Sequence, residues 1–142
     1  KLRLEYTSLF DLEEYIMKVG ILKKITAIIL IGLFSQFSLA DQASASRTIV
    51  GILIGMNHFA SDAEKAELMA VAADESLGRG YIMIANAVHD IQHAPTDEGK
   101  EVMNRIMGAA QAPAEVKALA EIVHGFSHSA SAEAKAALEA MR

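Results

Sequence analysis

The feature that most constrains the fold of this chain is a repeat with a period of 35 residues. His58, His93 and His128 recur at this interval, and each begins the pattern His-x-Ala/Pro-Ser/Thr-x-x-x-Lys. A period of this length is typical of proteins that are built from repeated supersecondary units. We therefore expect three structural copies of one unit.

A helix is predicted to lead into each of the three histidines. Apolar residues precede each histidine at the spacing i, i+3, i+4, i+7, which places them on one face of an α-helix. The aligned residues are Ile49, Ile52, Leu53 and Met56 in the first copy, Ile84, Ala87, Val88 and Ile91 in the second, and Leu119, Ile122, Val123 and Phe126 in the third. This face is expected to form the core.

A second helix is predicted to begin shortly after each histidine. Ser61, Thr96 and Ser131 lie three residues downstream, and Ser and Thr are favoured N-cap residues. Glu64 follows Ser61 at the spacing of a capping box. Together these patterns predict helices at about 46–57, 62–73, 80–92, 97–110, 114–127 and 132–141.

The predicted fold is all-α. Helices joined by short loops pack as antiparallel hairpins, and we expect a short right-handed stack of two and a half to three hairpins. Leu77-Gly78-x-x-Tyr81 resembles a fragment of the tetratricopeptide-repeat signature, in one copy only. The resemblance implies a similar shape and no family membership. Equivalent helices in a stack lie about 8–10 Å apart, so the histidines are expected to form a ladder.

Residues 17–40 have the composition of a secretory signal peptide. Three lysines follow Met17, the apolar run Ile25–Phe34 comes next, and Ser38-x-Ala40 matches a cleavage site. The apolar run is shorter than the ~20 residues that a membrane-spanning helix needs. We therefore expect an exported protein, periplasmic or secreted, with no stable membrane span after cleavage.

The remaining chain divides into two parts. Residues 1–16 precede the predicted signal and are interpreted as an upstream, non-native segment, whereas 41–142 form the helical-repeat domain. This domain has 8 Lys and Arg against 14 Asp and Glu, a net charge of −6. Scattered charge with an acidic balance gives no electrostatic footprint for nucleic acid, so nucleic-acid binding is not expected.

Two histidine pairs are candidate metal ligands. His89 and His93, and likewise His124 and His128, are four residues apart, so on a continuous helix each pair lies on one face. Two imidazoles can chelate one divalent ion, with Zn²⁺, Cu²⁺ or Ni²⁺ as the candidates. Two ligands make a weak site, however, and no HExxH motif is present.

The favoured interpretation of the three recurring histidines is structural. A histidine at the end of a helix hydrogen-bonds the terminal carbonyls and interacts well with the negative end of the helix dipole. A third role is a response to pH, because imidazole titrates between neutral and mildly acidic pH. The recurring lysines Lys65, Lys100 and Lys135 fall in the first turns of their helices and are expected to be solvated or ion-paired.

No catalytic motif is visible in the sequence, and we predict that the protein is not an enzyme. The chain has no cysteine, no glycine-rich phosphate loop and no recognisable Ser-His-Asp spacing. The leading prediction is an exported binding protein that holds a peptide, a partner protein or a second copy of itself on the concave face of the stack, without a cofactor. The alternative is a periplasmic metal-binding protein that uses the HxxxH pairs.

Overall fold

A computed structural model describes residues 39–142 of the chain. The predicted segment 1–16 and nearly all of the predicted signal peptide lie outside these residues; Leu39 and Ala40 begin the first described helix. The described residues form helices and isolated β-bridges, without a strand. The all-α prediction is confirmed. Within the same range, no helix has the length and apolar character needed to cross a membrane.

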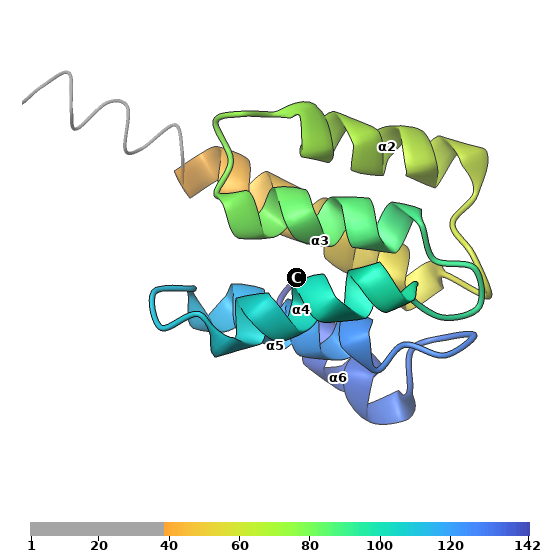
Figure 1. Cartoon of the computed structure of the whole chain (residues 1–142). Helices are drawn as coiled ribbons and strands as arrows, with labels where there is room; N and C mark the ends of the chain where they lie inside the picture. Colours follow the sequence, from red (N-terminus) through yellow and green to blue (C-terminus); the bar gives the residue numbers. More distant parts are fainter. Residues whose placement is uncertain (1–38) are drawn as a thin grey trace, which may run out of the picture. The chain divides into compact units, whose positions relative to one another are not determined.

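Along the chain, each helix that leads into a histidine is followed by a second helix, which forms a pair with it (Figure 1). They are the helix at 39–55, α2 (Asp62–Ala73), α3 (Arg79–His89), α4 (Asp97–Gly108), α5 (Ala114–His124) and α6 (Ala132–Glu139). The prediction was right for α2 and for the starts of α4, α5 and α6. It placed the ends of α3 and α5 three residues too late, because Ile91 and Phe126 leave the helix yet remain buried with the apolar face.

The predicted N-caps are confirmed. Each of the three side chains accepts a hydrogen bond from the N–H three residues on, at 3.4 Å for Ser61, 3.0 Å for Thr96 and 3.1 Å for Ser131. The Glu64 carboxylate accepts the Ser61 N–H at 2.7 Å and completes the capping box. These caps satisfy N–H groups that no helix carbonyl can reach.

The core is one cluster to which all three copies contribute equivalent residues. The leading helices contribute side chains with no exposed surface, namely Ile49, Leu53, Ile84, Val88, Leu119 and Val123. The second helices contribute Leu68, Met103 and Leu138, which are equally buried. Burial of a Leu, Ile or Val side chain stabilises the fold by about 1.5–3 kcal/mol.

The three copies close on one another instead of stacking in a line. The N–H of His58 donates to the carbonyl of His128 (2.5 Å), His93 donates to His58 (2.7 Å), and His128 donates to His93 (2.5 Å). The first and third copies are therefore in direct contact, whereas in a linear stack each copy contacts only its neighbours. The expected right-handed stack with a tetratricopeptide-like shape is not confirmed.

The opposite ends of the leading helices also converge. The Ser46 hydroxyl donates to the Glu115 carboxylate, which joins the first copy to the third. Gly80 lies against Val116, joining the second copy to the third. In both contacts, a residue at the repeat position of Gly80 meets a residue at the repeat position of Ser46 from another copy. Together with the ring of histidine hydrogen bonds at the other end, these contacts relate the helix at 39–55, α3 and α5 by an approximate threefold axis, and the three helices run in the same direction (Figure 1). The helices α2, α4 and α6 return along their outside.

Tyr81 lies at this end of the axis, at the repeat position of Ser46 and Val116. Its side chain is buried, with 5% of the residue exposed. Burial, together with the neighbouring Glu115 carboxylate, raises the pKa of Tyr81 to about 12. The phenol therefore holds its proton well above the ordinary pKa of tyrosine.

Candidate functional site: a cluster of three histidines

The three recurring histidines occupy a backbone conformation that is rare for residues other than glycine. Among residues 39–142, the positive-φ residues are His58 (φ 73°), His93 (φ 73°) and His128 (φ 62°). This left-handed region costs an L-residue free energy, although His, Asn and Asp enter it more often than other side chains. The same unusual turn therefore occurs three times within one chain.

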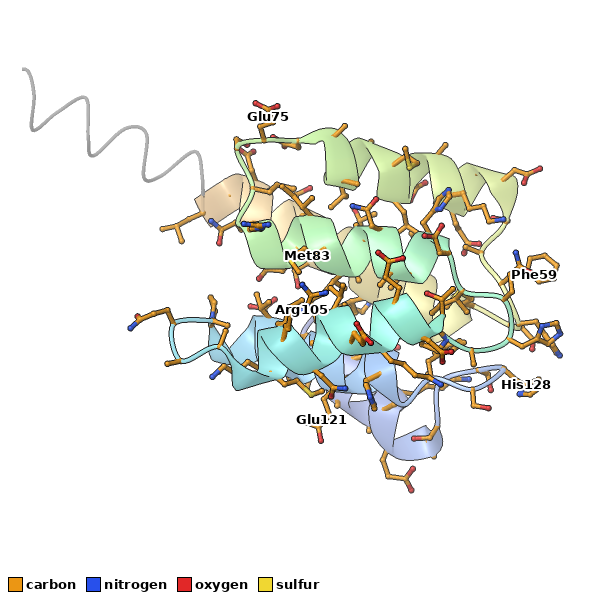
Figure 2. The ribbon with its side chains drawn as sticks, viewed as in Figure 1. Phe59, Glu75, Met83, Arg105, Glu121 and His128 are labelled. Atoms are coloured by element: carbon orange, nitrogen blue, oxygen red, sulfur yellow. The ribbon has the colours of Figure 1, made fainter. Side chains whose placement is uncertain are left out.

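Each histidine is at the tip of a tight turn between two helices. Isolated bridges join the residues on its two sides in each copy, namely Asn57 with Phe59, Gln92 with Ala94, and Ser127 with Ser129. Figure 2 shows Phe59 and His128 together at this loop end of the domain. The left-handed turn aims the histidine N–H groups and carbonyls at one another and so closes the ring of three backbone hydrogen bonds.

The three imidazoles form a compact cluster. The ring centroid of His58 lies 4.9 Å from that of His93 and 5.2 Å from that of His128, and the last two are 5.4 Å apart. The ring planes meet at 75–88°, so the contacts are edge-to-face. His58 is half-buried, and His93 and His128 are exposed. The predicted ladder with a spacing of about 8–10 Å is wrong.

The predicted metal pairs do not have the helical geometry on which they were based. His89 and His124 are the last residues of α3 and α5, so His93 and His128 belong to the turns beyond. The Nδ1 atom of His89 instead lies 2.7 Å from the Oδ1 atom of Asp90. Throughout residues 39–142, no three His, Asp or Glu side chains are already arranged as the ligands of a metal ion.

The predicted capping role also takes a different form. The backbone atoms of His58, His93 and His128 bond one another, and their side chains contact one another. The Nδ1 atom of His128 lies 3.2 Å from the Ser127 hydroxyl, at hydrogen-bond distance. The histidines therefore hold the three copies together at the backbone and gather three imidazoles on one surface.

The recurring lysines remain in the first turns of the outer helices, as predicted. The N–H groups of Lys65, Lys100 and Lys135 donate to the carbonyls of the N-cap residues at 2.8–2.9 Å. In the described part of the chain, none of them forms an ion pair. These three positions contribute backbone hydrogen bonds and solvated charge.

Comparison with known protein families, with curated proteins and with solved structures finds no match to this chain. An interpretation of its function therefore depends on the histidine cluster and on the cavities of the domain.

Proposed function

We propose that the protein binds a divalent transition-metal ion, Zn²⁺, through His58, His93 and His128. The main observation in support of this proposal is that the three imidazoles, one from each copy, lie with ring centroids 4.9–5.4 Å apart. The proposal retains the metal chemistry predicted from the sequence but moves it from the HxxxH pairs to the cluster on the threefold axis. It also retains the expected export of the protein.

The spacing of the rings matches a three-histidine zinc site. A Zn–N bond is about 2.0–2.1 Å long, and the centre of an imidazole lies about 1.1 Å beyond its nitrogen. Three rings with tetrahedral angles of about 109° at the metal therefore have centroids about 5.2 Å apart. The observed separations lie on both sides of this value, which supports binding of a common ion once the rings have rotated.

Metal binding requires rotation of the rings from the edge-to-face arrangement. The χ2 angle of histidine is broad, and the exposed rings of His93 and His128 are not confined by the core. The Ser127 hydroxyl next to Nδ1 of His128 leaves Nε2 as its free nitrogen. Zinc-ligating histidines commonly hydrogen-bond a polar group through their second nitrogen, which favours Ser127 in this supporting role.

The choice of residue at the three turns supports a role for the imidazole itself. Glycine satisfies a φ of 62–73° with less strain than any L-residue. All three turns nevertheless carry histidine. Three protein ligands leave the fourth position of a tetrahedral zinc ion open to water or a small anion.

Calorimetric titration with Zn²⁺ tests the proposal. We expect one ion per chain, bound more tightly than about 1 µM, with weaker binding at pH 5 because protonated imidazole is not a ligand. His58→Asn, His93→Asn and His128→Asn each remove a ligand, yet Asn tolerates the left-handed turn. Each single variant should lose at least about 10-fold in affinity, and the triple variant should lose the site.

The double variant His89→Ala/His124→Ala is the matched control, because it removes the two histidines outside the cluster. Its Zn²⁺ affinity should equal that of the unaltered chain. The proposal fails if the unaltered chain takes up no Zn²⁺ at micromolar concentration. It fails equally if the control loses the site, or if a folded triple Asn variant keeps it, with folding judged by circular dichroism.

A further inference from the structure

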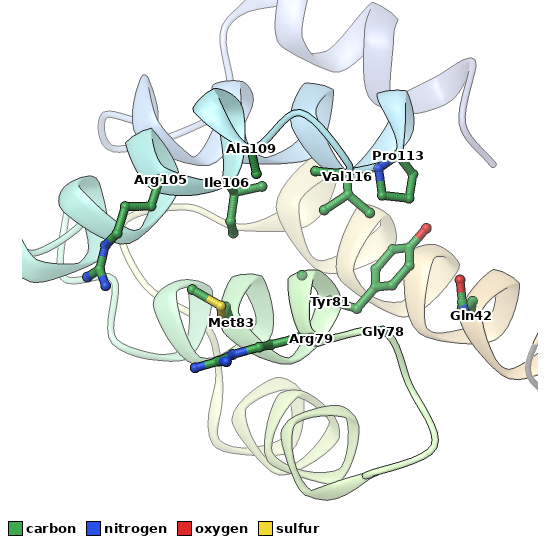
Figure 3. A pocket seen from close by; sticks show the side chains of 12 residues that line it. Gln42, Gly78, Arg79, Tyr81, Met83, Arg105, Ile106, Ala109, Pro113 and Val116 are labelled. Atoms are coloured by element: carbon green, nitrogen blue, oxygen red, sulfur yellow. The ribbon is translucent and has the colours of Figure 1, made fainter.

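A second candidate site lies at the other end of the domain, where α3, α4 and α5 meet (Figure 3). It is a cavity of about 320 Å³. Its walls are mainly apolar, with Tyr81, Met83, Ile106 and Val116 among the lining residues. A cavity of this size with apolar walls and a few polar groups is typical of small-molecule sites.

Two arginines border this cavity. Arg79 from α3 and Arg105 from α4 are both lining residues, and Figure 3 shows Arg79 below Met83 and Arg105 above and to the left of it. Neither arginine forms an ion pair within residues 39–142. Two guanidinium groups that have no ion-pair partner among these residues lie beside an apolar cavity, and they match an anionic group with an apolar body, since guanidinium binds carboxylates bidentately.

The arginines distinguish the second copy from the first. The first copy has a hollow of about 220 Å³ at the equivalent place. Ser44 and Ala70 occupy the positions of Arg79 and Arg105 there. Leu77 occupies the position of Ala112 there.

The third copy lacks the arginines as well. It has Ala114 and Ala140 at the two positions. The fold thus requires neither arginine, because both equivalent positions tolerate small side chains. The cationic rim is a specialisation of the cavity in the second copy.

We infer that this cavity binds a linear aliphatic carboxylate of about eight to ten carbons, a length that matches its volume. Arg79 and Arg105 hold the carboxylate, and the side chains of Met83 and Ile106 contact the aliphatic chain. The Tyr81 phenol interacts instead with Glu115 and Ser46, so it does not belong to the carboxylate site. The inference is independent of the histidine cluster and of Zn²⁺.

Calorimetric titration with decanoate tests the inference. Decanol, which has the aliphatic chain without the charge, and acetate, which has the charge without the chain, are the control ligands. Decanoate should bind one molecule per chain, at least about 10-fold more tightly than either probe. Arg79→Ser and Arg105→Ala install the residues of the first copy, and each should weaken decanoate binding about 10-fold while leaving decanol unchanged. Arg47→Ser is the matched control, since Arg47 is exposed and lines none of the described cavities.

A fourth variant tests the volume of the cavity. Ala112→Leu copies the Leu77 of the first copy, and we expect it to reduce decanoate affinity more than hexanoate affinity. The inference is wrong if decanoate does not bind below about 1 mM, or if the arginine variants bind it as tightly as the control does. Equal affinity for decanol and decanoate also overturns it. Zn²⁺ titration of the same variants should remain unchanged.

Discussion

The close approach of α3 to α5 makes a specific prediction about Gly80. A Cβ atom on Gly80 would lie 2.5 Å from Cγ1 of Val116, whereas non-bonded carbons pack at about 3.5–4.0 Å. Val116 is 2% exposed and has little room to move. Gly80→Ala should therefore overpack the interface by about 1–3 kcal/mol, partly offset by the helix preference of alanine, which is worth up to about 1 kcal/mol. We expect a net loss of about 1–2 kcal/mol.

Gly51 provides the matched control. It lies inside the helix at 39–55, is exposed, and a Cβ atom at this position would have no neighbour within 4 Å. Gly51→Ala should raise the free energy of unfolding by about 0.5–1 kcal/mol through helix propensity alone. Urea denaturation, followed by circular dichroism, measures both variants and should give opposite signs.

A double-mutant cycle with Val116→Ala tests whether the contact itself is responsible. Val116→Ala alone should cost about 1.6–3 kcal/mol from lost burial and the space that it leaves. The methyl group that Gly80→Ala adds partly fills that space, so the double variant should be more stable than the sum of the two single effects by at least about 1 kcal/mol. Additivity within about 0.5 kcal/mol, or stabilisation by Gly80→Ala alone, would refute the close approach and with it the convergence of the leading helices.

Two further predictions concern the turns and the buried phenol. His93 has a φ of 73°, so its replacement by Gly, Asn or Val should change the melting temperature in a fixed order. His93→Gly should melt at or above His93→Asn, and His93→Val should be the least stable by about 1–2 kcal/mol, because a β-branched residue is strained in the left-handed region. A Val variant as stable as the Asn variant would contradict the turn geometry. Because the pKa of Tyr81 is raised, the folded state holds the phenolic proton more tightly than the unfolded state does. The protonated phenol therefore contributes its full stabilisation below pH 10, and this contribution is lost as the pH rises towards about 12. Urea midpoints between pH 9 and 12 should fall more steeply in the unaltered chain than in Tyr81→Phe, and equal slopes would show that Tyr81 is not the group responsible.

The sequence predicted the local structure of the domain well because local structure depends on nearby residues. The apolar period identified the buried face, and Ser61, Thr96 and Ser131 marked the starts of the outer helices. The ends of α3 and α5 were harder to predict. Ile91 and Phe126 continue the apolar helical period and are buried, yet they lie beyond the ends of the helices. The helices end before them because the chain must reverse direction before the next N-cap, only a few residues later.

The closure of the repeat was not predictable from its period. A linear stack and a closed ring share the same hairpin unit and differ in the rotation between neighbouring copies. That rotation depends on contacts between residues far apart in the sequence, such as Ser46 with Glu115 and Gly80 with Val116. It depends also on the left-handed conformation of three histidines, which a sequence pattern of His followed by a cap does not reveal.

The closed arrangement explains why the residues of one candidate site recur in every copy of the repeat, whereas those of the other candidate site do not. A site on the threefold axis takes one residue from each copy, so its side chain must recur three times, as His58, His93 and His128 do. A site between the helices of one copy and its neighbour needs no recurrence, and Arg79 and Arg105 occur in the second copy alone. The proposed metal on the axis would also join the first copy to the third, where no loop connects them, and its binding to the folded state alone would add free energy to that closure. In the proposed function, the same three residues close the fold through their backbones and bind the ion through their side chains.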